Sequence, residues 1–252
     1  MTSLRVAVVG ADGRMGQAAC RAIDEAEGLE LVARINRAES LEAAKAAGAT
    51  IVVDFTNPDS VMANVQAAIA LGLHSVVGTS GFDEVRLSTV SGWLAERPEV
   101  GIVIAPNFAM GAVLLIRFAR EAARYFESVE IIELHHPDKV DAPSGTARHT
   151  AQVIAEARAH SGLPQAPDAT TTSLPGARGA DVAGVPVHAV RLRGLVAHEA
   201  VLFGGPGETL TLRHDSHDRA GFMPGVLLAV RKVSGLPGLT VGLEPLLDLE
   251  PS

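Results

Sequence analysis

The chain has 252 residues, of which 47% are hydrophobic and 20% charged, a globular composition that is long enough to bury a core without disulfides. Its formal net charge of −8, single Trp and single Tyr argue against a nucleic-acid partner, which would need basic and aromatic surfaces.

Cys20 is the only cysteine, which excludes an internal disulfide and a cysteine-rich metal site. Because it lies in an Ala-rich helical pattern, we expect a buried core thiol. The first strand is expected from residue 4 onward, which leaves no room for a signal peptide. No apolar stretch reaches the about 18 residues that span a bilayer. We therefore expect a cytoplasmic protein with no membrane partner.

In the first part of the chain, short apolar segments alternate with helical patterns. Strands are expected at 4–9, 30–35, 51–55, 75–77 and 101–105, and helices after the glycines at 10, 13 and 16 as far as residue 23, and at 41–47, 61–70 and 85–94. Strands that alternate with helices form βαβ units. We expect an α/β fold with a Rossmann-like doubly wound parallel sheet, in a dinucleotide-binding domain at residues 1–108.

The pattern changes after residue 108. A long amphipathic helix is expected at 112–125, followed by strands at 129–135, 185–192, 197–203 and 208–214 and a loop at 164–183. The late strands are separated by short Gly-rich turns, which indicates an antiparallel or mixed sheet. We expect a second α+β domain at 109–217 for substrate binding and oligomerisation. The tail, 218–252, with a helix near 223–232 and a strand at 239–243, is expected to pack back on the first domain.

A glycine-rich turn joins the first strand to the first helix. Gly10, Gly13 and Gly16 give the spacing G-x-x-G-x-x-G, a variant of the dinucleotide-binding fingerprint. Such glycines bring backbone amides close to a pyrophosphate, which then faces the helix N-terminus. An ordinary strand-to-helix turn is the alternative interpretation.

The end of the second strand distinguishes NAD from NADP, because a carboxylate there binds the ribose 2′-hydroxyl and a basic residue accommodates the 2′-phosphate. This chain has Arg34-Ile35-Asn36-Arg37, with no carboxylate in that stretch. We predict that NADPH is preferred, with NADH possible. Alternatively, Arg34 and Arg37 are solvated surface charges.

A cluster of His and Lys precedes a helix start. His135 and His136 end a strand, Lys139 follows, and Ser144 or Thr146 can cap the next helix, whose free amides suit a carboxylate. A histidine near neutrality can serve as a general acid, and a lysine can supply charge or a proton. A metal site is disfavoured because adjacent side chains of a strand point to opposite faces and no third ligand stands in the motif. A capped helix with incidental histidines is the other alternative.

The stretch Glu133-Leu134-His135-His136…Lys139…Asp141-Ala142-Pro143-Ser144-Gly145-Thr146-Ala147 closely resembles the signature of dihydrodipicolinate reductases. Four further segments agree with that family in the expected order: Gly78-Thr79-Ser80-Gly81-Phe82, Ala105-Pro106-Asn107-Phe108, Arg213-His214-Asp215-Ser216 and Phe222-Met223-Pro224-Gly225.

The resemblance implies an NAD(P)H-dependent oxidoreductase on the diaminopimelate route to lysine. Such enzymes reduce the cyclic imine formed from pyruvate and aspartate semialdehyde to tetrahydrodipicolinate. His135 would be the acid/base and Lys139 a second proton donor, while His136 would contact the substrate and the amides of Gly145 and Thr146, at the helix that follows Ser144, would hold a carboxylate. The residues that would bind the cofactor fall into two groups, Gly10, Ala11, Asp12, Gly13, Arg14 and Met15 on the pyrophosphate, and Gly78, Thr79, Ser80, Ala105, Pro106, Asn107 and Phe108 on the nicotinamide side.

The family is typically homotetrameric, which implies a homotetramer here with a small dicarboxylate as its ligand. Two departures from the family pattern matter. Ser80 stands where members usually have a second threonine, and Asn36 stands where many have an acidic residue, which favours NADPH. Two other functions stay open from the residues alone: another Rossmann-type dehydrogenase of amino-acid metabolism, and a non-catalytic NAD(P)-sensing protein.

Overall fold

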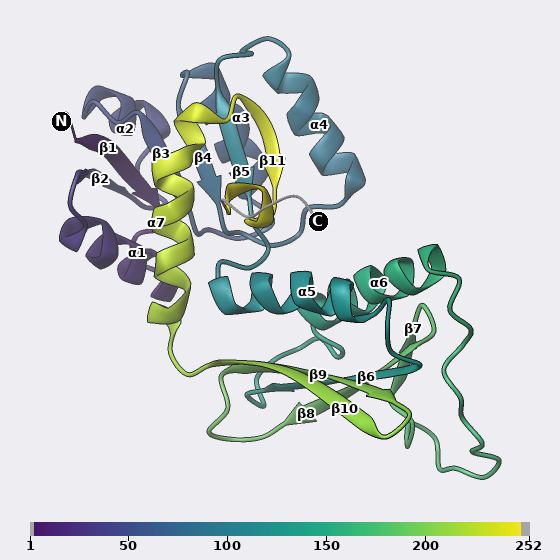
Figure 1. The fold of residues 1–252 in the computed structure, drawn as a ribbon. Helices are drawn as coiled ribbons and strands as arrows, with labels where there is room; N and C mark the ends of the chain where they lie inside the picture. The colour runs from purple at the N-terminus through teal and green to yellow at the C-terminus, as the bar shows by residue number, and fades with distance from the viewer. Residues whose placement is uncertain (1–2, 248–252) are drawn as a thin grey trace. The chain divides into compact units, whose positions relative to one another are not determined.

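Figure 1 shows a computed structural model that describes residues 3–247. The chain divides into two compact units, one made of residues 1–110 and 219–252, the other of residues 111–218. Cys20 is buried, as expected from its place in an apolar helix, with 3% of its surface exposed. Among the described residues, no helix is both long and apolar enough to span a membrane.

The first unit contains a six-stranded sheet in which every pairing is parallel. Its strands, in the spatial order β11-β5-β4-β3-β1-β2, are β11 (Gly238–Val241), β5 (Gly101–Ile104), β4 (His74–Val77), β3 (Ile51–Asp54), β1 (Leu4–Val9) and β2 (Leu29–Ile35). The chain reverses its direction of travel across the sheet between β1 and β3, where ligands of such sheets bind. The expectation of a Rossmann-like doubly wound sheet is confirmed.

Helices cover this sheet on both faces, because its strands are apolar on both sides. Two hydrophobic clusters lie on one face of the sheet, where Ala7, Val52, Val77 and Ile102 of the strands pack against helix residues. The helices of this unit are α1 (Arg14–Glu25), α2 (Leu41–Ala46), α3 (Val61–Ala70), α4 (Glu84–Leu94) and α7 (Met223–Lys232), with short 3-10 turns η1 (Arg219–Phe222), η2 (Val233–Gly235) and η3 (Glu244–Leu246). The strand expected at 51–55 ends at Asp54, because the Asp54 carboxylate accepts the Thr56 amide and turns the chain.

The second unit contains a five-stranded mixed sheet. In the spatial order β10-β9-β6-β8-β7, its strands are β10 (Glu208–Ser216), β9 (Ala197–Gly205), β6 (Ser128–His135), β8 (Val185–Arg191) and β7 (Ala180–Val182). All neighbours are antiparallel except β6 and β8, which run parallel. The sheet is therefore mixed, one of the two forms expected.

The prediction of a loop over residues 164–183 is wrong at its end, where β7 pairs with β8. The hairpin turns at Ala183 and Gly184, which both have positive φ, 54° and 84°. Two consecutive residues of positive φ make the tight turn that hairpins favour, but it is usually marked by Asn or Asp before Gly. An alanine in that place hid the turn.

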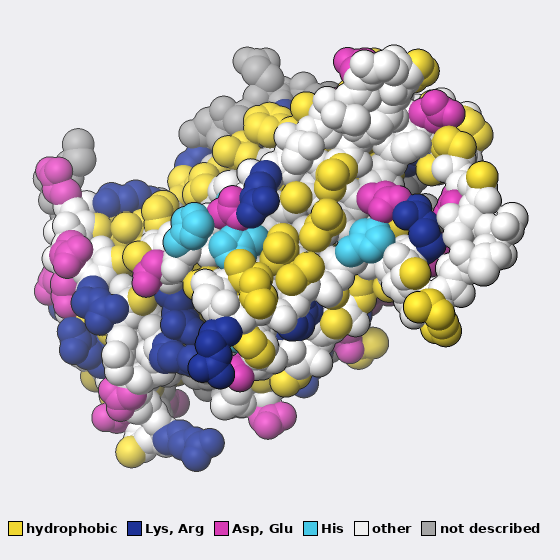
Figure 2. Space-filling view, turned by 90° about the horizontal axis from the view of Figure 1, so that it is seen from below, with side chains coloured by type: hydrophobic (Ala, Val, Ile, Leu, Met, Phe, Trp, Pro, Cys, Tyr) yellow, Lys and Arg dark blue, Asp and Glu magenta, His cyan; other side chains and the backbone are white. Residues whose placement is uncertain are grey.

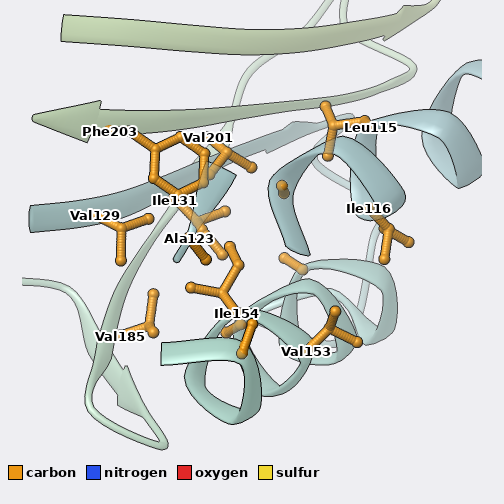
Figure 3. Packing of buried hydrophobic residues seen from close by; sticks show 14 of the residues in the cluster. Leu115, Ile116, Ala123, Val129, Ile131, Val153, Ile154, Val185, Val201 and Phe203 are labelled. Atoms are coloured by element: carbon orange, nitrogen blue, oxygen red, sulfur yellow. The ribbon is translucent and has the colours of Figure 1, made fainter. Parts of the chain in front are cut away.

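Two helices, α5 (Met110–Ala122, of which all but the first residue belong to this unit) and α6 (Gly145–His160), pack on one face of the mixed sheet. Figure 3 shows the core between them, where Ile131 and Val201 of the sheet meet Leu115 and Ile154 of the helices. The alternation along β6 sends Val129, Ile131 and Glu133 to this buried side. A fully buried carboxylate thus continues the row of core residues toward the end of β6.

Candidate active site

The glycine turn of the first unit is shaped for close backbone approach. Gly10 has φ +75°, and a Cβ there would lie 2.6 Å from the carbonyl oxygen of Phe55. A Cβ on Gly16 would lie 2.0 Å from the carbonyl oxygen of Gly10. Only glycine fits either position, and the absence of a side chain at both lets the backbone of the turn approach a phosphate.

The start of α1 leaves its first amides for an anion. Gly13 is the N-cap, no side chain caps the helix, and its first turn holds no acidic residue. The Asp12 amide donates to Oδ1 of Asn36 over 3.0 Å, which ties the turn to the tip of β2. Uncapped amides at a helix N-terminus attract a phosphate, so this turn fits the pyrophosphate of a dinucleotide.

The tip of β2 presents both signs of charge. Arg34 pairs with Asp24 at 3.2 Å, whereas the exposed Arg37 makes no polar contact within residues 3–247. The Asn36 amide donates to a carboxylate oxygen of Glu39 over 2.6 Å. The sequence interpretation did not include Glu39, because it stands three positions beyond the strand tip and only the turn of the chain brings it back.

A buried carboxylate links the ends of β3 and β4. Asp54 is 2% exposed and its Oδ1 accepts bonds from the Thr56 hydroxyl at 2.7 Å and the Thr79 hydroxyl at 2.8 Å. Its Oδ2 accepts from Nδ2 of Asn64 at 2.8 Å. The hydroxyl of Thr79 is therefore held by Asp54, and the neighbouring Ser80 is exposed. Sequence reasoning missed Asp54, although an acid at the carboxyl end of a buried strand is a usable signal.

Aromatic packing shapes the rest of this end of the sheet. The rings of Phe55 and Phe108 meet edge to face with centroids 5.9 Å apart, and a Cβ on Gly78 would lie 2.1 Å from the Phe55 ring. Ala105 and Phe108 are buried, whereas Pro106 is exposed. The segments at 78–80 and 105–108 are thus brought to the same edge of the sheet, near the glycine turn that packs on Phe55.

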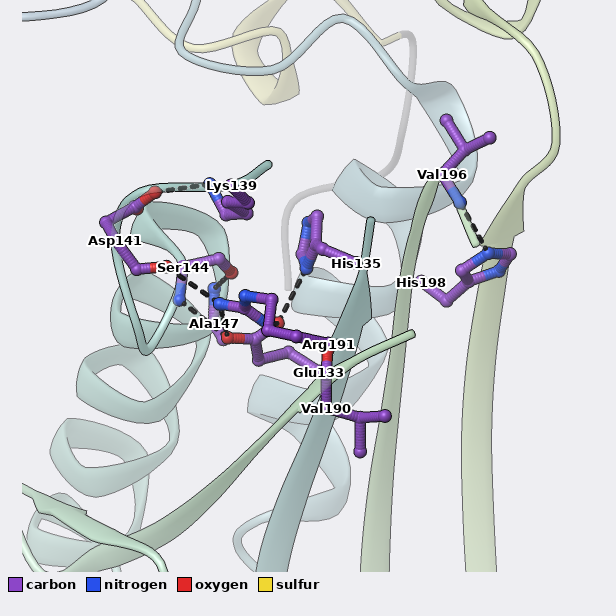
Figure 4. Close-up of polar contacts among 10 residues, drawn as sticks. All are labelled: Glu133, His135, Lys139, Asp141, Ser144, Ala147, Val190, Arg191, Val196 and His198. Atoms are coloured by element: carbon purple, nitrogen blue, oxygen red, sulfur yellow. Dashed lines mark hydrogen bonds and ion pairs between the residues drawn. The ribbon is translucent and has the colours of Figure 1, made fainter. Parts of the chain in front are cut away.

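In the second unit, His135 is joined to a buried ion pair. Nδ1 of His135 lies 2.6 Å from Oε2 of Glu133, and Glu133 receives both terminal nitrogens of Arg191, at 2.7 and 2.8 Å (Figure 4). Glu133 has no exposed surface. Burial alone would raise the pKa of Glu133, but the bonds from His135 and Arg191 outweigh it and lower the pKa to about 2. Glu133 therefore stays ionised.

Lys139 forms an ion pair with a residue two positions further along the chain. Its Nζ lies 2.7 Å from Oδ1 of Asp141, and the Asp141 carbonyl accepts a bond from Arg191 at 2.7 Å (Figure 4). Burial would raise the pKa of Asp141, but the hydrogen bond and the charge of Lys139 outweigh this effect, so the pKa is lowered. Arg191 thus connects the His135 side of the site to the Lys139 side.

The helix α6 begins at the same place. Ser144 is its N-cap and accepts a bond from the Ala147 amide at 3.1 Å, which decides between the two caps expected. The Ser144 amide donates to Oε1 of Glu133 at 3.0 Å, so the helix start is fastened to the buried carboxylate. The next amides, those of Gly145 and Thr146, stand at the N-terminus of a helix, which favours an anion. Asp141 already uses part of this favourable position, because it accepts a hydrogen bond from the Gly145 backbone. That bond also lowers the pKa of Asp141.

The residues expected in the second motif are brought together by β6, the loop after it and α6. His136 lies half-buried beside His135, and its carbonyl accepts the Lys139 amide at 3.3 Å. Across residues 3–247, no three His, Cys, Asp or Glu side chains are arranged to hold a metal ion. Sequence reasoning missed Arg191, and it quoted Glu133 and Asp141 only as parts of the signature.

Comparisons with known proteins agree along the whole chain. Residues 4–108 match the family model described as dihydrodipicolinate reductase, N-terminus, and residues 111–247 match the one described as dihydrodipicolinate reductase, C-terminus. A 4-hydroxy-tetrahydrodipicolinate reductase of Nocardia farcinica is 61% identical over 247 residues, covering 98% of this chain and 100% of the relative. One of Mycolicibacterium smegmatis is 58% identical over 246 residues, with 98% and 100% covered.

Solved structures give the same result. A dipicolinate-bound dihydrodipicolinate reductase from Paenisporosarcina sp. TG-14 has a TM-score of 0.86 and 38% identity, and the match covers 98% of this chain and 100% of that one. An amine dehydrogenase from Mycobacterium smegmatis has a TM-score of 0.63 at 10% identity, with 95% of each chain covered, which shows a shared fold alone. Both family models and the close relatives lead to one conclusion: the chain belongs to the dihydrodipicolinate reductase family.

Proposed function

We propose that the chain reduces 4-hydroxy-tetrahydrodipicolinate, by way of its cyclic imine, to tetrahydrodipicolinate. The carrying observation is His135 bonded to the fully buried Glu133, next to Lys139 and a helix start that suits a carboxylate. A bound nicotinamide cofactor supplies the hydride. The protein has to bind the dicarboxylate, orient it and deliver a proton.

His135 is the proposed proton donor. With Nδ1–H directed at Glu133, the other ring nitrogen, Nε2, is left for substrate. The Glu133 carboxylate stabilises the protonated imidazole and fixes the plane of the ring, as the carboxylate of a catalytic triad does. Because Arg191 and the Ser144 amide also bind Glu133, this carboxylate cannot turn away from His135.

The substrate carboxylates meet positive groups on a chain whose formal net charge is −8. We place one carboxylate on Lys139 and the amides of Gly145 and Thr146, next to the cap residue Ser144, with His136 as a further contact. Asp141 now holds Lys139 at 2.7 Å, so a substrate carboxylate would compete with it for the ammonium. A lysine held beside the reacting ring is also placed to give a second proton.

The first unit is the proposed cofactor domain. Backbone amides from Gly10 to Met15 would bind the pyrophosphate, and the segments at 78–80 and 105–108 would line the nicotinamide. We propose that NADPH is preferred and NADH accepted. The free guanidinium of Arg37 supports the 2′-phosphate, whereas the Glu39 carboxylate is engaged by the Asn36 amide.

We propose that the second unit also assembles the protein as a homotetramer. The helices α5 and α6 cover one face of its sheet, and the side chains of Ile132, Leu134 and Val190 point to the other. Figure 2, a view from below Figure 1, shows hydrophobic side chains gathered between histidines. Leu202 on the same face is 38% exposed. Light scattering coupled to gel filtration tests this, since a monomer would contradict it.

The activity is tested by coupling the chain to a synthase that makes its substrate from pyruvate and aspartate semialdehyde. Loss of the near-ultraviolet absorbance of NADPH, then of NADH, is recorded with each component left out in turn. Oxidation that needs every component supports the reductase. Folded protein that binds NADPH yet oxidises neither cofactor would overturn it.

A further inference from the structure

A row of polar side chains crosses the mixed sheet of the second unit beneath its helices. In the strand register, Glu133 on β6 lies opposite Glu199 on β9, and Glu199 lies opposite His214 on β10. Directly opposed residues of antiparallel strands point to the same side of a sheet. The polar row therefore lies on the core side of the sheet. It is two residues along each strand from the apolar pair Ile131 and Val201.

Glu199 is a buried acid without a cation. It is 6% exposed, and its Oε1 has no hydrogen-bond partner. No Lys, Arg or His within residues 3–247 forms an ion pair with it, and the guanidinium of Arg191 binds Glu133 instead. An unpaired charge in such a place is strongly disfavoured. Burial raises the pKa of Glu199 to about 7, a hydrogen bond with Thr150 opposes this, and the charge of Glu133 adds to it.

The groups on the neighbouring strands do not compensate a charge on Glu199. Opposite it on β6 is the ionised Glu133, and opposite it on β10 is His214, whose pKa is lowered by burial. The next residue of β10, Asp215, is held by Arg213 and His198. Across one strand pair the neighbour is thus negative, and across the other it is an imidazole whose charged form is disfavoured by burial.

No charged group of the helices above the row contributes to the pKa of Glu199 either. From α6 the buried Thr150 faces it, while Arg148 and His149 of that helix are exposed. From α5, Gly111 lies against His214, where an added Cβ would be 2.5 Å from the imidazole ring. The Thr150 hydroxyl donates to the Thr146 carbonyl at 3.0 Å and can accept from a neutral carboxyl, or rotate to donate to a carboxylate.

We propose that Glu199 is a positioning residue of the active site: while neutral it leaves Glu133 as the ionised carboxylate beside His135, and on ionising it adds a second negative charge there. The inference rests on the proposed role of His135 as the acid. A second negative charge beside the site stabilises the positive charge that His135 carries as the proposed acid. Glu199 thereby widens the pH range of the reductase.

The neutral state of Glu199 is tested without activity. Infrared spectra of the full chain record the carbonyl stretch of a neutral carboxylic acid, for the wild type, Glu199→Gln and the exposed control Glu208→Gln. At about pH 6 the band is expected in the wild type and in the control, and absent from Glu199→Gln; by about pH 8.5 the wild type should lose it. A spectrum of Glu199→Gln identical to wild type at both pH values would overturn the proposal.

A second variant guards against a loss of folding in the first. Thr150→Val removes the hydroxyl that favours the carboxylate, so the band should persist to higher pH than in the wild type. An unchanged transition in a folded Thr150→Val protein would count against the assignment of this band to Glu199.

The effect on catalysis is read from kcat against pH with saturating substrates. Relative to wild type, kcat of Glu199→Gln is expected to fall about three- to ten-fold between pH 6 and pH 8.5, the scale of the interaction between one added charge on a neighbouring strand and a protonated imidazole. The ratio for Glu208→Gln should stay flat. Parallel profiles for Glu199→Gln and wild type would overturn the positioning role. Absence of reductase activity in every protein would instead refute the proposed function, while the infrared result still decides whether Glu199 is neutral.

Discussion

Nδ1 of His135 lies 2.6 Å from Oε2 of Glu133, and the two side chains come from the same strand, two positions apart. Residues two apart in a strand share a face, so β6 itself sets the distance between them. Glu133 faces the core and has no exposed surface, whereas His135 is one step further along the same face, where the strand ends. The end of β6 therefore places the imidazole of His135 directly against a buried ion pair.

Glu133→Gln should separate orientation from acid chemistry. Gln keeps the volume and can still accept from His135, but it removes the charge that Arg191 and a protonated His135 require. We expect His135→Ala to lower kcat by about 10²–10⁴-fold, and Glu133→Gln to lower it less, by about 10–100-fold, with a lower pKa on the alkaline limb. Steady-state kinetics over pH measures both. A Glu133→Gln enzyme with an unaltered pH profile would contradict the proposed support of the imidazole.

Lys139→Ala is expected to lower turnover by about 10²–10⁴-fold, because it removes the proposed second proton donor and the proposed cation for a substrate carboxylate. Asp141→Asn serves as the matched variant, since it releases Lys139 from its partner at 2.7 Å while keeping the ammonium. Substrate KM should rise in Lys139→Ala and not in Asp141→Asn. Equal kinetic effects of the two changes would mean that the ion pair matters rather than the ammonium.

Much of this arrangement could be predicted from sequence. Short apolar segments between helical patterns predicted the parallel sheet, because strands buried on both faces have no polar alternation. The motif from His135 to Thr146 is continuous in sequence, and so its members meet through local structure alone. Ser144 rather than Thr146 caps α6, a choice that needed the backbone geometry.

The sequence analysis missed two kinds of residue: one that long-range strand pairing brings in, and others that act within a local turn. Arg191 stands 58 positions after Glu133 and reaches it because β8 runs parallel beside β6. No spacing rule predicts that register. Glu39 and Asp54 make local contacts instead. Glu39 accepts the Asn36 amide and Asp54 accepts the Thr56 amide, each within a turn of the backbone. β7 was missed because an Ala-Gly turn lacks the usual hairpin residues.

Arg37→Ala should weaken NADPH far more than NADH, because the guanidinium is free to meet a 2′-phosphate that NADH lacks. We expect KM for NADPH to rise about ten-fold and KM for NADH to change less than about two-fold, the scale of one surface charge contact with a phosphate. Lys45→Ala, an exposed cation on α2 of the same unit, is the control. A similar loss for both cofactors in Arg37→Ala would remove the proposed basis of the preference.

Glu199 also gives the stability of the fold a definite pH dependence. Its folded pKa is raised to about 7 from 4.5, so the neutral form is stabilising below about pH 4.5, and this contribution is lost as the pH rises through about 7. The full loss amounts to about 3 kcal/mol of unfolding free energy. Glu199→Gln should therefore be more stable than wild type at about pH 8.5 and little different near pH 4.5, as measured by urea unfolding. A difference that does not change with pH would show that the side chain acts through packing alone.

Asp54→Asn tests whether the buried carboxylate positions the nicotinamide end of the first unit. An Asn amide can keep one acceptor for Thr79 and Thr56, but its own NH₂ group would face Nδ2 of Asn64, which now donates to Asp54. Two donors in contact leave at least one unsatisfied, at about 1–3 kcal/mol. We expect a lower melting temperature and a cofactor KM several-fold higher, with substrate KM unchanged, because the proposed substrate-binding residues belong to the other unit. Asn64→Asp in the same background would restore an acceptor opposite the new donor, and should recover the cofactor KM if that contact is the cause. Failure of this second change to recover it would locate the defect in the Thr79 contact instead.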